Sequence, residues 1–453
     1  MSDFLFDGNA ESVFILKGYA GTGKTSLVGA LVRSLLQLKQ QVVLMAPTGR
    51  AAKVFASHSG HAAYTIHRRI YRQKAFTGDM TDFMQGVNLK KNTLFIVDEA
   101  SMIANLGGNG AAFGTGRLLD DLVHFVYSGE GCRLMLVGDT AQLPPVGEAE
   151  SPALIPEVLA SYGLHPYTLT LTEVVRQLAG SGILWNATKL RQLLTTGALG
   201  AFPQLHLAGF ADIVSLPGEE LIETLEQAYY ECGTDGTIVV TRSNTRANLY
   251  NNGIRASILD YDSELTGGDQ VIIVKNNYHW LKEEEATDFI ANGDIAVVRR
   301  LRDEREVHGF RFADITLRFP DYDDLEVEAT VLLDTLQSEA PALTREQQEA
   351  LFQRVWEDYP ELTVKRDRMK AVKEDPYFNA LQIKYAYAVT CHKAQGGQWE
   401  RVFIDQGYVT EEMLSADYFR WLYTAITRAT EKVYLINWPR QELDEESQRM
   451  MEE

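Results

Sequence analysis

One strand-loop-helix pattern near the start of the chain limits its fold more than any other stretch. An apolar run, VFILK, precedes GYAGTGKT, and a run of good helix formers follows as far as Leu38. This order completes the motif G-x-x-x-x-G-K-[ST] in the context typical of a phosphate-binding loop, or P-loop. The glycines let backbone N–H groups surround phosphate oxygens, and the following helix points its positive end at them. The sequence therefore predicts nucleotide binding by Gly18, Gly21, Thr22, Gly23, Lys24, Thr25 and Ser26.

Two side chains of the P-loop have separate predicted roles. Lys24 would reach toward the β and γ phosphates, and the hydroxyl of Thr25 would bind Mg²⁺. A purely structural loop is the alternative. The strand before the motif and the helix after it favour the nucleotide site.

The length of the chain predicts more than one domain. At 453 residues it exceeds what one hydrophobic core organises, so about two to four domains are expected. Its cysteines are odd in number and far apart, which predicts reduced thiols rather than disulfides or a zinc site; they are Cys132, Cys232 and Cys391. No segment approaches the ~18 apolar residues that cross a bilayer. We therefore expect a soluble, cytoplasmic protein with no membrane partner.

Charge is unevenly distributed along the sequence. The net charge of −19 argues against a surface that binds nucleic acid everywhere. Residues 50–91, however, are rich in basic side chains and contain only Asp79 and Asp82 as acidic ones. This stripe predicts a local groove for one nucleic-acid strand, and a solvated basic face is the alternative. Its members are Arg50, Lys53, Arg68, Arg69, Arg72, Lys74, Lys90 and Lys91.

Polar residues follow two further predicted strands. The run TLFIVDEAS places Asp98 and Glu99 at the carboxyl end of a buried strand, where an open α/β sheet carries its ligand chemistry. Asp98 would hold Mg²⁺ and Glu99 would polarise an attacking water, although the pair alone could be an ordinary strand end. The run RLMLVGD leads into GDTAQLPP, where the Gln142 amide could sense a γ phosphate. By itself that segment is only a turn.

The second half of the chain changes from alternating strands and helices to β-rich sequence. From Gly267, short apolar runs alternate with NN, NG and PDYDD turns, which predicts a small barrel inserted into an α/β body. Charged helical sequence covers residues 344–373, and the α/β pattern returns at Tyr385. The alternation of strands and helices elsewhere predicts parallel sheets covered by helices.

Taken in order, the motifs resemble a known series. GYAGTGKT, APTGRAAKV, DEAS, GDTAQLPP, VVRQ, TCHKAQG and YTAITRA are similar to the motifs of superfamily 1 helicases. The spellings TIHR, HKAQG and TAITRA, with a β-rich insert before HKAQG, resemble the RecD and Dda branch, whose members move 5′ to 3′. The resemblance spans Phe14 to Ile436.

The resemblance implies a fold of class α/β with two RecA-like P-loop lobes. Lobe 1 would cover residues 1–150, with a pin-like insert at 72–91. Lobe 2 would cover 151–266 and 375–453, and a β-rich, SH3-like insert would occupy 267–374.

The resemblance also implies roles for individual residues. Glu99 would be the general base, Gln142 would link the γ phosphate to lobe closure, and Arg176 and Arg428 would reach the γ phosphate from lobe 2. Thr25 and Asp98 would bind the metal. Phe76 and Phe83 would belong to the pin. The residues facing a single strand would be Pro47, Thr48, Arg50, Lys53, His67, Arg68, Thr390, His392 and Lys393.

We therefore expect an ATP-dependent, 5′ to 3′ DNA helicase with ATP and Mg²⁺ as cofactors. Its expected partners are single-stranded DNA, forked duplexes and proteins of DNA repair, recombination or replication. A regulatory ATP-binding subunit of a recombination or repair complex and an RNA-directed translocase are the alternatives. The sequence leaves the pathway and the oligomeric state open.

Overall fold

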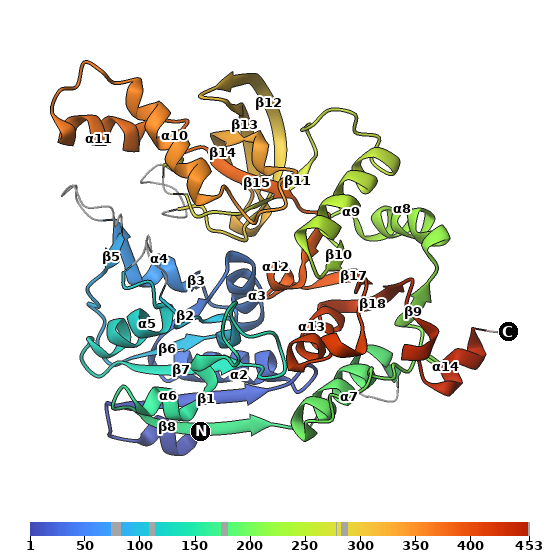
Figure 1. Ribbon diagram of the computed structural model, residues 1–453. Coiled ribbons are helices and arrows are strands. Elements are labelled where there is room, and N and C mark those ends of the chain that lie inside the picture. The colour runs from blue at the N-terminus through green and yellow to red at the C-terminus, as the bar shows by residue number, and fades with distance from the viewer. Residues whose placement is uncertain (74–82, 108–113, 174–179, 278, 282–288, 452–453) are drawn as a thin grey trace. The chain divides into compact units, whose positions relative to one another are not determined.

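The computed structural model describes residues 1–73, 83–107, 114–173, 180–277, 279–281 and 289–451 (Figure 1). The chain forms two compact units. Unit 1 contains Met1–Gly218 and Ala394–Glu453, and unit 2 contains Glu219–Lys393.

The main sheet of unit 1 is parallel and carries the P-loop. Its six strands have the order β3-β2-β6-β7-β1-β8, and all neighbouring strands pair in parallel. Helices α2 and α3 pack on β2, and α5 packs on β7. The inner strands are continuous apolar runs because helices cover both faces of such a sheet. The strands are β1 Ser12–Gly18, β2 Gln41–Ala46, β3 Ala63–Thr65, β6 Thr93–Val97, β7 Arg133–Gly138 and β8 His165–Leu171; the helices are α2 Lys24–Gln37, α3 Gly49–Ser59 and α5 Leu118–Tyr127.

The edge strand β8 lies beyond residue 150, where we expected lobe 1 to end. It pairs with β1 from Ser12 opposite His165 to Gly18 opposite Leu171. The sheet with the P-loop thus continues to Leu171. The division into lobes and insert at residues 150, 266 and 374 stays a prediction.

Unit 1 also contains a second parallel set of strands, β9-β18-β17. Helix α13 packs against α7 and against β17 and β18. A short antiparallel pair, β4 and β5, lies in the region of the predicted pin. These elements are β9 Ile213–Leu216, β17 Trp399–Asp405, β18 Ala429–Ile436, β4 Tyr71–Gln73 and β5 Phe83–Gln85; the remaining helices of unit 1 are α1 Ser2–Phe6, α4 Ile66–Ile70, α6 Pro156–Ala160, α7 Gly182–Thr196, α13 Ala416–Ile426 and α14 Glu445–Met450.

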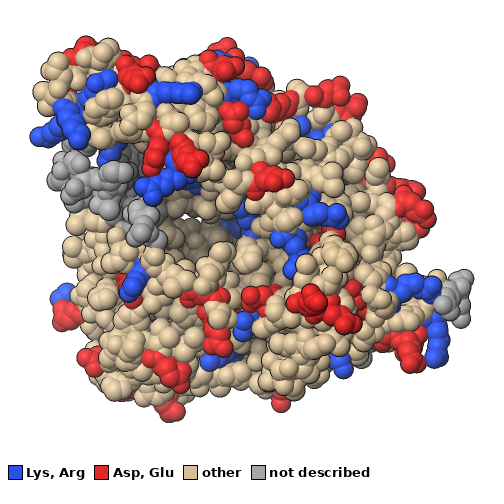
Figure 2. Space-filling view, viewed as in Figure 1, with Lys and Arg blue, Asp and Glu red and all other residues tan. Residues whose placement is uncertain are grey.

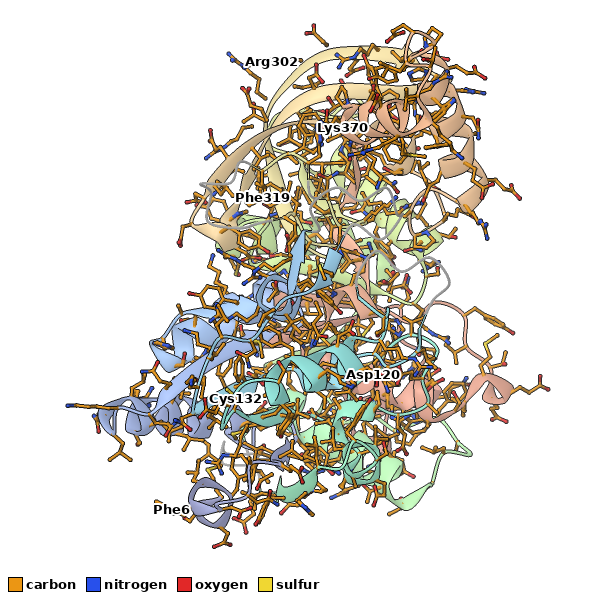
Figure 3. All side chains as sticks on the ribbon, turned by 90° about the vertical axis from the view of Figure 1, so that its left-hand side faces the viewer. Phe6, Asp120, Cys132, Arg302, Phe319 and Lys370 are labelled. Carbon is orange, nitrogen blue, oxygen red and sulfur yellow. The ribbon has the colours of Figure 1, made fainter. Side chains whose placement is uncertain are left out.

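The predicted β-rich insert is confirmed as a closed barrel in unit 2. Its last strand follows residue 374, so the barrel extends past the predicted end of the insert. In Figure 3, Arg302 projects outward from β12, whereas Phe319 of β13 is buried. The barrel strands are β11 Gln270–Ile273, β12 Ile295–Val307, β13 Phe310–Phe319, β14 Leu325–Leu332 and β15 Leu381–Tyr385.

Helices complete unit 2. α10 begins with a capping box, in which the Thr344 hydroxyl accepts from the Gln347 N–H and the Gln347 side chain accepts from the Thr344 N–H. An apolar cluster packs these helices against the barrel through Phe312, Leu351, Val355 and Val372. The helices of unit 2 are α8 Leu221–Cys232, α9 Asn244–Ser257, α10 Arg345–Glu357 and α11 Lys365–Glu374; α12 is Cys391–Ala394, and the parallel strand pair is β10 Thr237–Thr241 with β16 Ala388–Thr390.

Basic and acidic side chains are interspersed over the face shown in Figure 2, so this face is not uniformly basic. Among the described helices, none combines the length and the apolar composition needed to cross a membrane.

Candidate nucleotide-binding site

The P-loop has the geometry that its glycines predict. It connects the end of β1 at Gly18 to the start of α2 at Lys24. Gly21 and Gly23 adopt left-handed φ angles of 75° and 80°, which favour glycine. A Cβ added to Gly18 would lie 2.6 Å from Cγ of Lys24. The loop therefore closes tightly around the lysine stem.

The Lys24 ammonium group is held within this loop. Its Nζ donates to the carbonyl oxygens of Gly18 at 2.5 Å and Tyr19 at 3.0 Å. It also lies 3.6 Å from Oδ2 of Asp139, a carboxylate that is 1% exposed. A phosphate that recruits Lys24 would compete with these oxygens. Asp139 is the second residue of the GDTAQLPP segment, but it is not among the predicted site residues.

The predicted acidic pair follows β6, as expected. The Asp98 N–H donates to the carbonyl of Met45, and Oδ1 of Asp98 accepts from the Glu99 N–H at 2.8 Å. Burial and the neighbouring Glu99 raise the pKa of Asp98 to about 7, while Lys24 opposes this shift. Glu99 has a φ of 52°, a conformation that is uncommon for a residue with a side chain. Such strain is frequent at functional sites.

The residues present fit a magnesium ion. No group of three or more His, Cys, Asp and Glu side chains in the described ranges could hold a metal by itself. Mg²⁺ does not need one, because it is commonly bound by one or two protein oxygens together with waters and phosphates. Thr25 and Asp98 would supply these oxygens. A buried carboxyl with a raised pKa is a reasonable ligand, since a cation favours its ionised form.

The Gln142 amide is positioned to receive a ligand. The residue is 5% exposed, and its Oε1 is buried without a hydrogen-bond partner in the part of the chain that the structure describes. The side chain lines a cavity of about 230 Å³, together with Lys17, Glu150 and Arg420. A buried amide oxygen without a partner is costly in a folded protein. This cost is relieved if a ligand or water bonds to it.

The loop after β7 is bonded to the C-terminal part of unit 1. The Leu143 N–H donates to Oγ1 of Thr424 at 2.9 Å, and the Gln395 amide donates to the Leu143 carbonyl at 2.7 Å. The Tyr423 hydroxyl donates to Oδ2 of Asp139 at 2.7 Å. The motifs HKAQG and YTAITRA contain Gln395, Tyr423 and Thr424, but none of the three is a predicted site residue. In the sequence, only their position in these two motifs pointed to a functional role.

Arg428 lies just beyond the end of helix α13. α13 ends at Ile426 with Thr427 as its C-cap, and Arg428 follows it. The Thr427 hydroxyl donates to the carbonyls of Tyr423 and Thr424 in the last turn of the helix. The Arg428 guanidinium is buried and donates to the carbonyls of Thr424 at 3.0 Å and Gly397 at 3.1 Å. Contact with a phosphate would require it to exchange some of these bonds.

Two family descriptions match the chain around these residues. The sequence model of the AAA domain family matches residues 8–202, and that of the UvrD-like helicase C-terminal domain matches residues 385–436. The first match contains the P-loop, Asp98 and Gln142, and the second contains Arg428.

Two similar proteins are named DNA helicases, and they match different shares of the chain. It is 25% identical to the ATP-dependent RecD2 DNA helicase of Deinococcus radiodurans over 433 residues, which are 93% of this chain. It is 29% identical to the ATP-dependent DNA helicase Dda of Enterobacteria phage T4 over 36% of this chain. Together these matches make the chain similar to superfamily 1 helicases of the RecD and Dda type.

The matches cover different shares of these relatives' own lengths. The match covers 46% of the RecD2 protein and 35% of Dda. An uncharacterised protein of Acanthamoeba polyphaga mimivirus is 22% identical, and the match covers 94% of this chain and 95% of the viral one. Among solved structures, the Bacteroides Pif1 helicase in complex with ADP-AlF3 and ssDNA is 15% identical, with a TM-score of 0.48 over 98% of this chain and 94% of that one.

In unit 1, the residues predicted to face a nucleic-acid strand lie in α3, just before it, and in α4. The Thr48 hydroxyl, after Pro47, caps α3 by accepting from the Ala51 N–H. Lys53 is exposed on α3. The Arg50 guanidinium lies 4.1 Å from the ring centroid of Trp399 and donates to the Gln398 carbonyl at 2.9 Å. Arg50 therefore already contacts the C-terminal part of unit 1.

The α4 residues differ in charge. Burial lowers the pKa of His67 to about 4, so its imidazole is neutral at pH 7 and would offer a phosphate no positive charge. The guanidinium of Arg68 lies 5.3 Å from the ring centroid of Tyr64. Of these two predicted contacts, only Arg68 carries charge.

The other predicted contacts to nucleic acid belong to unit 2. Thr390 ends β16, and His392 and Lys393 lie in α12. Burial, and then the nearby Lys384, lower the pKa of Lys393 to about 8. Phe76 and Arg176 lie outside the described residues, as does the side chain of Phe83, whose backbone belongs to β5.

Proposed function

We propose that the chain is an ATP-dependent DNA helicase that moves 5′ to 3′ along single-stranded DNA. One observation carries the proposal: hydrogen bonds and an ion pair connect the P-loop to the C-terminal part of unit 1. Lys24 lies beside Asp139, and Asp139 is bonded to Tyr423. A helicase needs such a connection, because ATP turnover has to move one part of the protein against another.

Hydrolysis would use the residues around the P-loop. Lys24 and the loop N–H groups would bind the phosphates, and Glu99 would orient and deprotonate the attacking water. Mg²⁺, held by Thr25 and Asp98, would neutralise charge on the β and γ phosphates. Gln142 would bond to the γ phosphate, and Arg428 would stabilise the charge that develops there. Arg176 is proposed for the same role on the basis of its motif.

Strand translocation would follow from the loss of the γ phosphate. The loop after β7 carries Gln142 and is bonded to Gln395 and Thr424 through the backbone of Leu143. A change at Gln142 would therefore shift the C-terminal segment. We propose that the nucleic-acid residues of both units grip the strand by turns during this cycle. Backbone contacts from Arg and Lys would make binding salt-dependent and largely independent of sequence.

Support for DNA as the substrate comes from the relatives named DNA helicases. RecD2 and Dda are both so named, and each is longer than its matched part. Forked duplexes and proteins of repair, recombination or replication are proposed as partners on the same basis. We also propose that the chain is divided into two RecA-like lobes, a pin at 72–91 and an SH3-like insert that begins at residue 267.

ATPase assays with different polymers test the proposal. We expect turnover to rise on addition of single-stranded DNA and to rise less with single-stranded RNA. Stronger stimulation by RNA would favour an RNA-directed translocase. ATP binding without turnover would favour a regulatory subunit. Unwinding of duplexes with either a 5′ or a 3′ single-stranded tail then tests polarity, and unwinding of only the 3′-tailed substrate would contradict the proposed direction.

A further inference from the structure

Tyr423 makes a contact at the P-loop that its motif did not predict. Its hydroxyl oxygen accepts the Ala20 N–H at 2.8 Å, although Ala20 lies 403 residues earlier in the chain. The same hydroxyl donates to Oδ2 of Asp139 at 2.7 Å. One oxygen atom thus joins the P-loop backbone, the loop after β7 and helix α13.

The helix geometry explains why Tyr423 lies there. Arg420, Tyr423 and Thr424 are spaced three and four residues apart, so they share one face of α13. Arg420 donates to the Ala149 carbonyl at 2.7 Å, and Thr424 accepts from the Leu143 N–H. This face is therefore bonded to the loop after β7 at several points. Tyr423 is the member of this group whose hydroxyl also contacts the P-loop.

The environment of the hydroxyl keeps it a donor. Tyr423 and Asp139 are each 1% exposed. Burial, with the Asp139 carboxylate beside it, raises the pKa of Tyr423 well above its ordinary value, so the hydroxyl stays protonated at neutral pH. Asp139 also accepts from the Ala141 N–H at 2.9 Å and lies 3.6 Å from Nζ of Lys24. Its Oδ2 is thus shared between the Tyr423 hydroxyl and the Lys24 ammonium.

We propose that Tyr423 is a positioning residue for ATP hydrolysis, which holds Asp139 in place so that Lys24 is free to bind phosphate. The inference rests on the proposed function. When Lys24 turns toward a phosphate, the buried carboxylate keeps the Tyr423 hydroxyl and the Ala141 N–H as donors. Without the hydroxyl, Asp139 would be short of a donor and would hold Lys24 more strongly. The lysine would then be withdrawn from the phosphates.

The substitution Tyr423→Phe removes the hydroxyl and keeps the ring. We expect kcat for ATP to fall about tenfold, the kinetic equivalent of one lost hydrogen bond. Tyr418→Phe is the matched control, because Tyr418 is also buried on α13 but donates to Oε1 of Gln406 at 2.8 Å. That variant should keep the wild-type kcat. Thermal unfolding of both variants would report any difference in stability.

A double substitution separates positioning from a merely structural role. If Tyr423 acts by restraining Asp139, the Tyr423→Phe/Asp139→Asn protein should turn over ATP no more slowly than Asp139→Asn alone. A structural role predicts that the two losses multiply. Wild-type kcat in Tyr423→Phe, an equal loss in Tyr418→Phe, or multiplied losses in the double variant would each overturn the inference. The proposed function fails separately, if the wild-type chain hydrolyses no ATP.

Discussion

The Glu99 backbone N–H donates to Oδ1 of Asp98 at 2.8 Å, so the predicted metal ligand is held against the backbone of the predicted general base. Asp98 is turned back onto the backbone at the end of β6. Glu99 takes a left-handed conformation with a φ of 52° and leads into the 3₁₀ turn Ala100–Met102. Asp98 and Glu99 therefore have different environments, which suits a metal ligand and a general base.

Removing the charge of Glu99 should stop turnover and spare binding. Glu99→Gln keeps the side-chain shape but cannot accept a proton from water, so kcat should fall by a factor on the order of 10² or more. Titration calorimetry with ATP should still detect binding. Glu130→Gln, an exposed glutamate paired with Lys91, is the control and should keep wild-type kcat. Normal turnover in Glu99→Gln would contradict the assignment of the base.

Arg428 should be required for hydrolysis more than for strand binding. Arg428→Lys keeps the positive charge but loses the planar set of donors that now reach Thr424 and Gly397. We expect kcat to fall by a factor on the order of 10³, as for arginines that stabilise a phosphoryl-transfer transition state. Binding of a labelled single strand, measured by fluorescence anisotropy, should change little. Arg449→Lys, on the exposed face of α14, is the control; unchanged ATPase in Arg428→Lys would assign Arg428 a purely structural role.

Asp269 should stabilise unit 2 by neutralising a buried arginine. Nε and Nη2 of Arg255 donate to the two Asp269 oxygens at 2.8 and 2.9 Å, and the carboxylate is fully buried. Asp269→Ala should lower the free energy of unfolding by about 3–5 kcal/mol, because Arg255 would be left buried and uncompensated. Urea-induced unfolding measures this loss.

A second pair on the barrel provides the comparison for Asp269. Arg305 also makes two bonds to Asp314, through Nη1 and Nη2 at 2.7 and 2.8 Å, but the two side chains are 30% and 38% exposed. Asp314→Ala should therefore cost only about 1 kcal/mol or less. If both alanine variants lose the same free energy of unfolding, burial does not determine how much each ion pair stabilises the unit.

Asp294 should make the stability of unit 2 depend on pH. Burial raises its pKa to about 7 from 3.8, although the Ala291 N–H and the Tyr322 hydroxyl donate to its carboxylate. Between about pH 4 and pH 7 the unfolded carboxyl is ionised while the folded one retains its proton. The contribution of Asp294 to stability is therefore greatest at low pH. It falls by up to about 1.4 kcal/mol per pH unit as the pH rises toward 7.

Comparison with Asp294→Asn isolates this effect. Urea-induced unfolding at pH 5, 6, 7 and 8 should show the wild-type protein losing stability relative to the variant up to about pH 7. Above that pH the difference should become constant. Parallel stability curves for the two proteins would contradict the raised pKa.

Local sequence determined the elements that carry the candidate site. The spacing of Gly18, Gly23 and Lys24 specified the P-loop, because glycine permits its left-handed backbone angles and the flanking runs form a strand and a helix. The apolar run before Asp98 placed the acidic pair at a strand end. Short β-rich runs between turns indicated the barrel. In each case the information lies within a few residues of the feature.

Tertiary structure decided which of these residues meet. The Ala20 N–H finds the Tyr423 hydroxyl 403 residues away, and Arg50 reaches the Gln398 carbonyl 348 residues away. The pairing of β8 with β1 and the raised pKa of Asp98 depend in the same way on packing between distant segments. Backbone angles and hydrophobic periodicity are local properties, so spacing reveals them. The partner and the burial of a side chain depend on the packing of the whole unit, which no local spacing encodes.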